Sequence, residues 1–174
     1  MMDLGEIRDT RPEDWPQIYS LIERVFLRSD EARFMRNLLD NDDVVLSLAH
    51  QRRPGEHGEI TGFIAYSRVL LETDDGLYDA LAMAPLVVDP SCQGKGIGLE
   101  LLSISQEILK AMGEKLSFVL GEPDYYAKLG YSPEVASKFK GPYSGPYLLG
   151  LRYSDDIPSS GTLIYPEAFA QVKG

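Results

Sequence analysis

Apolar side chains near the start of the chain recur at a helical period. Between residues 15 and 27 they stand three or four positions apart, at Ile18, Leu21, Ile22, Val25 and Phe26. This spacing places them along one face of a helix that buries a single stripe. A second helix is predicted to open at Ser29 and to end at Asn41, and its inner face carries the apolar residues Phe34, Leu38 and Leu39.

The next part of the chain alternates between apolar and polar positions and predicts an antiparallel meander. Residues 44–50 and 58–71 are expected to form two strands joined by a turn, in which His57 is solvated. The turn sequence Thr73-Asp74-Asp75-Gly76 then leads into a third strand over residues 78–88. A short strand over residues 5–10 precedes the first helix.

The strand over residues 78–88 is apolar on both faces, which is typical of a central strand covered on both sides. One predicted face carries Ala80, Ala82, Ala84, Leu86 and Val88, and the other carries Leu81, Met83, Pro85 and Val87. Pro85 has no backbone N–H to donate to a neighbouring strand. We therefore expect either a bulge or splay that interrupts pairing at Pro85, or an edge position for this strand.

Beyond this strand the pattern predicts a parallel crossover. A helix is expected from Gly96 to Met112, with Gly113 as its C-cap, and a buried strand follows over residues 116–120. Next come a short helix containing Tyr125 and Tyr126, a strand over residues 147–153 and a helical turn over residues 166–169. This order predicts a mixed α/β (α+β) fold in a single domain spanning residues 1–174.

Composition narrows the classes of protein that fit. The 174 residues are 44% hydrophobic, which is enough for one domain with a real core. No window approaches the ~18 uninterrupted apolar residues of a membrane span. The first six residues also lack the basic flank and apolar region of a signal peptide. We therefore predict a cytoplasmic protein with no membrane partner.

Net charge and cysteine content argue against further kinds of partner and of site. A net charge of −10 argues against a nucleic-acid partner, because phosphate backbones are bound by clustered Lys and Arg. It is compatible with a cationic amine substrate, and equally with an acidic surface that only maintains solubility. Cys92 is the sole cysteine, so internal disulfides and cysteine clusters for a metal are excluded, and no metal site is expected. Cys92 is either an incidental small residue or, less in keeping with the sequence, a nucleophile.

A glycine-rich loop between the strand at residues 78–88 and the following helix has the layout of an anion site. It reads Gln93-Gly94-Lys95-Gly96-Ile97-Gly98. Glycines let the backbone approach a ligand, and the first N–H groups of the helix point at negative charge. The alternate spacing of the glycines does not match the dinucleotide fingerprint, and Gly96 stands where a Walker loop needs Ser or Thr after the lysine.

This loop resembles the acyl-CoA loop of the GNAT N-acetyltransferase superfamily, in which Gln or Arg is followed by two variable residues, Gly, one residue, and Gly or Ala. The segment Tyr126-Ala127-Lys128-Leu129-Gly130-Tyr131 is similar to a second motif of that family, with Tyr131 in place of Phe. The Gly121-Glu122-Pro123-Asp124 turn and the two tyrosines after it resemble an uncharacterised bacterial subgroup. The resemblance implies a central, mostly antiparallel twisted sheet splayed between its fourth and fifth strands, with helices on both faces.

The resemblance also implies roles for named residues. Acetyl-CoA would lie in the splay, with its pantetheine arm paired to the backbone of Leu86, Val87 and Val88. Its pyrophosphate would be held at the loop, by Gln93, Gly94, Lys95, Gly96, Ile97 and Gly98. Tyr126 would be the general acid for the leaving thiolate, whereas Tyr125 would point elsewhere. Many family members carry Asn where this chain has Val119, seven residues before the tyrosine.

Several matters stay open on the sequence. Glu122, Asp124, Asp79 and Glu72 are weak candidates for a general base, and a water relay would need none of them. The expected reaction is direct transfer of an acetyl group to a primary amine on a small molecule or peptide. The alternatives are a catalytically silent CoA-binding or regulatory domain and a binder of another phosphate ligand. Tyrosines and prolines at residues 143–147 are expected to serve a homodimer or a wall of the acceptor site.

Overall fold

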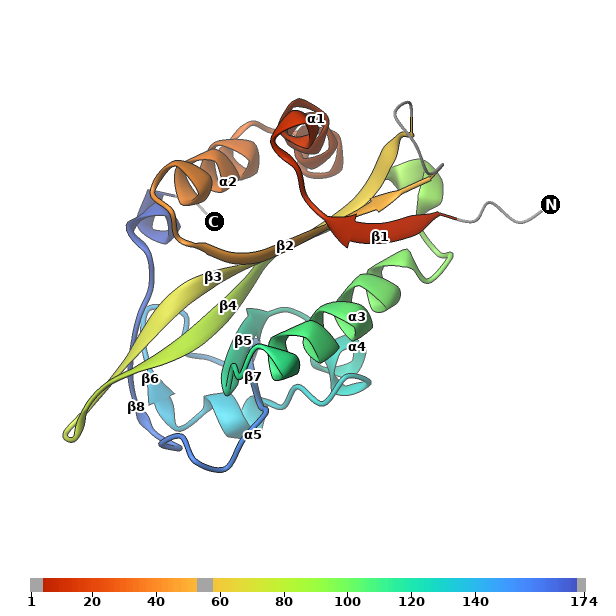
Figure 1. Cartoon of the computed structure of the whole chain (residues 1–174). Helices are drawn as coiled ribbons and strands as arrows, with labels where there is room; N and C mark the ends of the chain where they lie inside the picture. Colours follow the sequence, from red (N-terminus) through yellow and green to blue (C-terminus); the bar gives the residue numbers. More distant parts are fainter. Residues whose placement is uncertain (1–4, 53–57, 172–174) are drawn as a thin grey trace.

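A computed structural model describes residues 5–52 and 58–171 (Figure 1). The predicted turn with His57 and the first four residues therefore lie outside the described residues. A single mixed sheet runs through the molecule, with helices packed on both of its faces (Figure 1). The architecture is the mixed α+β fold that the pattern predicted. No helix in the described ranges is both long and apolar enough to cross a membrane.

The strands occur in the predicted order, with further short strands near the C-terminus. Those described are β1 (Glu6–Asp9), β2 (Val44–Gln51), β3 (Ile60–Thr73), β4 (Gly76–Val88), β5 (Leu116–Leu120), β6 (Phe139–Lys140), β7 (Leu148–Arg152) and β8 (Gly161–Ile164). The sheet order is β1-β2-β3-β4-β5-β7. Pairing is antiparallel from β1 to β4, parallel between β4 and β5, and antiparallel between β5 and β7.

Helices flank this sheet as two layers. The helices α1 (Trp15–Phe26) and α2 (Asp30–Asp40) cover one face, and α3 (Ile97–Ala111) covers the other (Figure 1). The connection β4-α3-β5 is the predicted crossover, and Gly113 follows α3 with a φ of 86°, as expected of a C-cap. The shorter helices are α4 (Pro123–Ala127), α5 (Pro133–Ala136), η1 (Pro12–Asp14), η2 (Pro90–Cys92) and η3 (Glu167–Gln171).

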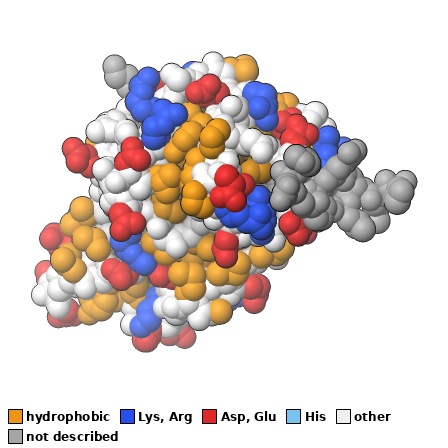
Figure 2. Space-filling model, turned by 45° about the horizontal axis from the view of Figure 1, so that its top comes forward, with side chains coloured by type: hydrophobic (Ala, Val, Ile, Leu, Met, Phe, Trp, Pro, Cys, Tyr) orange, Lys and Arg blue, Asp and Glu red, His pale blue; other side chains and the backbone are white. Residues whose placement is uncertain are grey.

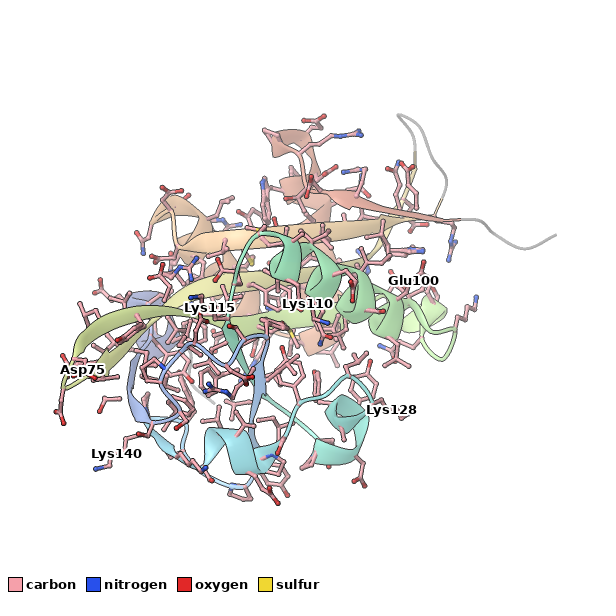
Figure 3. The ribbon with its side chains drawn as sticks, turned by 60° about the horizontal axis from the view of Figure 1, so that its bottom comes forward. Asp75, Glu100, Lys110, Lys115, Lys128 and Lys140 are labelled. Atoms are coloured by element: carbon pink, nitrogen blue, oxygen red, sulfur yellow. The ribbon has the colours of Figure 1, made fainter. Side chains whose placement is uncertain are left out.

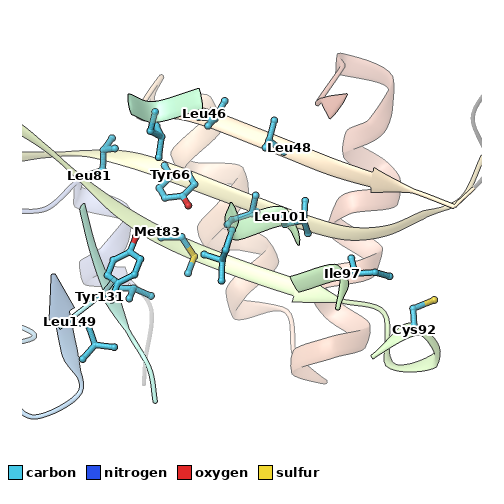
Figure 4. Close-up of a cluster of buried hydrophobic side chains, with 14 residues drawn as sticks. Leu46, Leu48, Tyr66, Leu81, Met83, Cys92, Ile97, Leu101, Tyr131 and Leu149 are labelled. Atoms are coloured by element: carbon cyan, nitrogen blue, oxygen red, sulfur yellow. The ribbon is translucent and has the colours of Figure 1, made fainter. Parts of the chain in front are cut away.

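Each face of the sheet has its own core. On the α3 side the sheet residues Leu46, Tyr66 and Leu81 pack with Leu101 of the helix (Figure 4). On the other side Ile18 and Leu38 of the first two helices pack against Phe63 and other residues of β3. The hydroxyl of buried Tyr66 shares a 2.7 Å hydrogen bond with the Ser105 hydroxyl, so this polar group is satisfied.

A bulge at Pro85 reverses the two faces of β4. Tyr66 of β3 is opposite Met83 but Ile64 is opposite Leu86, so β4 has one extra residue between these pairs. Leu86 and Val88 therefore pack on the α3 side, together with Leu81 and Met83. Val87 packs on the other side. The predicted assignment of faces is wrong beyond Pro85, because it assumed an unbroken alternation.

The strands β4 and β5 separate soon after they meet. They pair only at Leu81 with Ser117 and at Ala82 with Phe118. Beyond these residues β4 continues along β3, while β5 continues along β7. The splay expected from Pro85 and from the family resemblance is confirmed, and the alternative of an edge strand is wrong because β4 lies between β3 and β5.

The C-terminal part holds elements that the pattern did not predict. These are α5, β6 and β8, and the predicted helical turn at residues 166–169 is the 3-10 helix η3. The strand β8 pairs with β3 at Leu70, Leu71 and Glu72, beyond the part of β3 that β2 covers. The strand β8 forms because it pairs with β3, which is distant in the sequence, and not because of its own hydrophobic periodicity. Its sequence pattern therefore did not predict it.

Candidate functional site

The turn that follows β4 is held in place by Asp89. Its Oδ1 accepts hydrogen bonds from the backbone N–H of Ser91 at 3.0 Å and from the Ser91 hydroxyl at 2.8 Å. Its Oδ2 accepts one from Arg24 Nη2 at 2.9 Å. Burial alone would raise the pKa of Asp89, but the bonds from Ser91 and Arg24 outweigh it and lower the pKa. A charged Asp89 thus ties the turn to α1.

The glycine loop after this turn presents free backbone donors. Gly94 and Gly96 have φ angles of 80° and 85°, a left-handed conformation that favours glycine. Among the described residues, no acceptor binds the backbone N–H groups of residues 94–98. Gly96 is also the N-cap of the fifteen-residue helix α3, whose dipole favours negative charge at this end. The loop is therefore built to bind an anion.

The side chain of Gln93 fastens the loop to the edge of β4. Its Nε2 donates to the carbonyl oxygen of Val88 at 3.0 Å. Because β5 has already separated from β4 at this point, the carbonyl of Val88 has no strand partner on that side. The first residue of the motif thus links the anion-binding loop to the open part of the splay.

A groove of about 490 Å³ runs along this loop and the end of β4, and we call it the loop groove. It brings together all but one of the predicted cofactor-binding residues: Leu86, Val87, Val88, Gln93, Gly94, Gly96, Ile97 and Gly98. Lys95 is the exception, because it lines a neighbouring polar cavity with His50 and Arg52. The other residues lining the loop groove are Val25, Cys92, Leu99 and Tyr125.

Tyr125 was not predicted to lie in this groove. A Cβ atom placed on Gly98 would lie 3.0 Å from the Tyr125 hydroxyl, so the tyrosine reaches from α4 across to the start of α3. Lys128, at the outer end of α4, stands 5.9 Å from the centre of the Tyr125 ring (Figure 3). Tyr125 thus points elsewhere than Tyr126, as expected, but its hydroxyl lies beside the glycine loop, where the sequence did not place it.

On the other side of Leu86 lies a second cavity of about 420 Å³, which we call the apolar pocket. Its wall consists of the ends of α1 and α2, the bulge of β4, the end of β5 and the C-terminal aromatics: Phe26, Arg28, Glu31, Phe34, Met83, Ala84, Pro85, Leu86, Val119, Leu120, Tyr126, Tyr143 and Phe169. Leu86 lines both cavities, so the loop groove and the apolar pocket meet at the splay.

Tyr126 faces the apolar pocket and is held there by its neighbours. Its ring makes edge contacts with Tyr125 and Tyr131, at centroid distances of 4.9 and 5.9 Å. Gly121 leaves space for it, because a Cβ at that position would lie 2.3 Å from the ring. Burial, with a smaller contribution from Tyr125, raises the pKa of Tyr126 to about 12. The hydroxyl is therefore protonated at neutral pH and able to donate.

The carboxylates that the sequence offered as bases do not line either cavity, whereas Glu31 does. Asp79 and Glu72 lie toward the opposite end of β4, and Glu122 and Asp124 are absent from both linings. Glu31 stands in the first turn of α2 and accepts hydrogen bonds of 3.0 and 2.9 Å from Arg28 Nε. In the sequence Glu31 stands only at the start of the second predicted helix, and no motif indicates a functional role for it.

Cys92 lies at the border of the loop groove and is almost completely buried, with 3% of its surface exposed. Its sulfur accepts a hydrogen bond from Arg52 Nη2 at 2.7 Å. No group of three or more His, Cys, Asp or Glu residues in residues 5–52 and 58–171 is arranged to hold a metal ion. Polar groups thus reach the splay from both cavities. The loop groove contributes backbone N–H donors and Tyr125, and the apolar pocket contributes Tyr126 and the paired Arg28 and Glu31.

Comparison with known families agrees with this geometry. The family described as the acetyltransferase (GNAT) domain matches residues 6–133, which include the loop groove, Tyr125 and Tyr126. The chain belongs to the GNAT acetyltransferase family. This is a family of acyltransferase enzymes, as the resemblance of the two motifs implied.

Relatives of this family are found at the levels of sequence and structure. The chain is 33% identical over 140 residues to the uncharacterised N-acetyltransferase YjhQ of Escherichia coli, covering 79% of this chain and 75% of the relative. It resembles the crystal structure of the GNAT protein YhbS from Escherichia coli in complex with CoA, with a TM-score of 0.85, 25% identity and coverage of 98% and 94%. A GNAT acetyltransferase from Brucella melitensis in complex with acetyl-CoA gives a TM-score of 0.78, 26% identity and coverage of 97% and 99%.

The structure shows where Val119 and the tyrosines near residue 143 lie relative to the two cavities. Val119, which stands where many members of the family carry Asn, is buried and lines the apolar pocket. Tyr143, which the sequence offered for a dimer or an acceptor wall, also lines the apolar pocket, while Tyr147 is exposed. The homodimer stays a prediction.

Proposed function

We propose that the protein transfers the acetyl group of acetyl-CoA to a primary amine by direct attack at the splay. The observation that carries this proposal is the meeting of the loop groove and the apolar pocket at Leu86. Two similar proteins were solved with CoA or acetyl-CoA, which supports the loop groove as the site of that cosubstrate. An amine held in the apolar pocket would then reach the thioester from the opposite side.

The loop residues fit the cosubstrate chemically. The free N–H groups of residues 94–98 and the N-terminus of α3 would bind the pyrophosphate, and Lys95 at the loop would screen its charge. Beyond Ala82 β4 has no β5 partner, so the backbone groups of the Leu86, Val87 and Val88 segment that face away from β3 would hydrogen-bond the amides of the pantetheine arm. Acetyl-CoA supplies an activated acyl group, and the protein orients it toward the apolar pocket.

Tyr126 is the proposed catalytic residue. The amine nitrogen forms a bond to the carbonyl carbon as the carbon–sulfur bond breaks, and the departing thiolate takes the proton of the Tyr126 hydroxyl. The proton lost by the amine goes to solvent, from which Tyr126 is reprotonated. This hydroxyl makes no hydrogen bond to the described part of the protein, and its pKa of about 12 keeps it protonated.

The test is release of CoA thiol from acetyl-CoA with a panel of primary amines, on the wild type and on Tyr126→Phe. The variant is expected to lower amine-dependent release by about 100-fold or more, with the affinity for acetyl-CoA unchanged within about threefold. Tyr147→Phe, which removes an exposed hydroxyl, is the matched control and should behave as wild type.

Three outcomes would contradict parts of this proposal. Acetyl-CoA binding without amine-dependent release would support a silent CoA-binding domain instead. Equal release by Tyr126→Phe and the wild type would overturn the role of Tyr126. Failure to prefer acetyl-CoA over ATP or nicotinamide dinucleotides would overturn the assignment of the loop groove.

A further inference from the structure

An ion pair forms part of the wall of the apolar pocket. Arg28 and Glu31 are the charged residues, among those described, that line this pocket. Each oxygen of the Glu31 carboxylate accepts a hydrogen bond from Arg28 Nε, at 3.0 and 2.9 Å, and Oε1 also accepts one from Arg28 Nη2. The pocket therefore presents a positive and a negative charge side by side in a wall that is otherwise mostly apolar.

The two members of this pair differ in exposure. The Glu31 side chain is 11% exposed, whereas the Arg28 side chain is 45% exposed. Among the described residues, no acceptor binds Arg28 Nη1. Glu31 thus fixes the guanidinium through Nε and Nη2 and leaves the N–H groups of Nη1 available to a ligand. A guanidinium that is held in one orientation with available N–H groups is suited to bind a carboxylate.

Aromatic rings that support one another form much of the remaining wall. Phe34 and Phe169 pack edge to face, with their ring centroids 4.9 Å apart. Tyr165, which lines a neighbouring cavity of about 90 Å³, packs on Tyr143 and Phe169 at centroid distances of 4.9 and 5.1 Å. The apolar pocket thus combines a preformed aromatic surface with its ion pair, and such a surface favours a large apolar group on the ligand.

On the basis of the proposed function, we propose that the acceptor is a free α-amino acid with a large apolar side chain. An amino acid carries its carboxylate on the carbon next to the amine, so its two adjacent charges are complementary to the pair of Arg28 and Glu31. The carboxylate binds the Arg28 guanidinium, the amine lies toward Glu31 and the splay, and the side chain packs on the aromatic rings. Polyamines are disfavoured because a second ammonium group would lie against apolar walls.

The experiment compares kcat/KM for L-phenylalanine and L-phenylalaninamide with saturating acetyl-CoA. The amide keeps the ring but has no carboxylate, as at the N-terminus of a peptide. Values are expressed per concentration of neutral amine, since the two amines differ in pKa. For the wild type we expect L-phenylalanine to exceed its amide by about tenfold or more, because its carboxylate gains charge-assisted hydrogen bonds. It should exceed L-alanine by a similar factor, because alanine buries less apolar surface.

Substitution of Arg28 separates a carboxylate contact from a structural role. Arg28→Gln should lower kcat/KM for L-phenylalanine by about tenfold or more, mainly through KM, and change that for the amide by less than about threefold. Arg28→Lys keeps the charge and should lose less than Arg28→Gln. Arg33→Gln is the matched control, because Arg33 pairs with Asp30 at the same sequence spacing, at 3.5 Å, but does not line the pocket. It should keep the wild-type preference.

Distinct results would overturn the inference and the proposed function. A wild-type value for L-phenylalaninamide or L-alanine that equals or exceeds that for L-phenylalanine would overturn the inference and leave amine acetylation intact. Equal losses for L-phenylalanine and its amide in Arg28→Gln would assign Arg28 a purely structural role and also overturn it. Absence of acetylation with every amine, in a protein that binds acetyl-CoA, would instead overturn the proposed function.

Discussion

At the scale of single residues, two tyrosines that are adjacent in the sequence lie on opposite sides of the splay. Tyr125 lines the loop groove and Tyr126 lines the apolar pocket. Glycines accept both side chains, because Gly98 leaves room for the Tyr125 hydroxyl and Gly121 leaves room for the Tyr126 ring. The position of Tyr126, the proposed general acid, therefore depends on Gly121, which has no side chain that could react.

Gly121→Ala tests this dependence. The added methyl would stand 2.3 Å from the Tyr126 ring and force it to move. We expect turnover with the best amine to fall by about 10- to 100-fold, since a displaced catalytic group loses its alignment, while acetyl-CoA affinity is preserved. Gly141→Ala, whose Cβ would meet its neighbours at ordinary contact distances, should stay near wild type.

A double variant separates positioning from general damage to the fold. If Gly121 acts only through Tyr126, then Gly121→Ala adds little to the loss already caused by Tyr126→Phe. Losses that multiply in the double variant would show that Gly121 acts independently of Tyr126.

At the scale of elements, the first strand and first helix are joined by a buried ion pair. Asp14 accepts hydrogen bonds from Arg8 Nη1 at 2.7 Å, from Arg8 Nη2 at 3.0 Å and from the backbone N–H of Arg11 at 2.7 Å. Asp14 is 5% exposed. The hydrogen bond from Arg8 and the neighbouring charges lower the pKa of Asp14, although burial opposes them. This contact holds α1 against the sheet, and α1 in turn carries Arg24 to Asp89.

Asp14→Ala should lower the free energy of unfolding by about 3 kcal/mol, because the half-buried Arg8 guanidinium loses its carboxylate partner and keeps only hydrogen bonds to Gln51 and the Asp9 carbonyl. The pKa of Asp14 is depressed in the folded state, so its contribution is present above the ordinary value of 3.8 and is lost as the pH falls through the folded value. Urea unfolding should therefore show a constant difference between wild type and variant from pH 8 to 5, and a smaller one below about pH 4.

The exposed residue Asp9 provides the control for this pair. Asp9→Ala removes a neighbouring surface carboxylate and should change stability by less than about 0.5 kcal/mol. A loss for Asp14→Ala no larger than that of the control would contradict the importance of the buried pair.

At the scale of the whole molecule, the features encoded by local pattern were predictable from the sequence. The helical stripe beginning at Ile18, the glycine loop and the crossover from β4 to β5 follow from periodicity and motif. The bulge at Pro85 was foreseen, but its effect on the faces of Leu86 and Val88 depends on register with β3 and was not. Likewise, β8 and the contribution of Glu31 and Tyr165 to the cavities depend on long-range packing and were not predicted.

Charged side chains of both signs share the surface of the molecule. On the face turned toward the viewer in Figure 2, Lys and Arg side chains are interspersed with Asp and Glu. On this face the basic side chains therefore do not form one continuous patch. The residues that line the loop groove and the apolar pocket meet at the splay and come from both halves of the chain.

We propose that acetyl-CoA and the amine meet at Leu86 and react directly. The most direct test is initial-rate kinetics, varying acetyl-CoA at several fixed concentrations of the best amine. Direct attack requires both substrates to be bound together, so we expect intersecting lines in double-reciprocal plots and no acetylated enzyme after incubation with acetyl-CoA alone. Parallel lines together with an acetyl group on Cys92 would contradict it, because they would indicate a covalent intermediate on the protein.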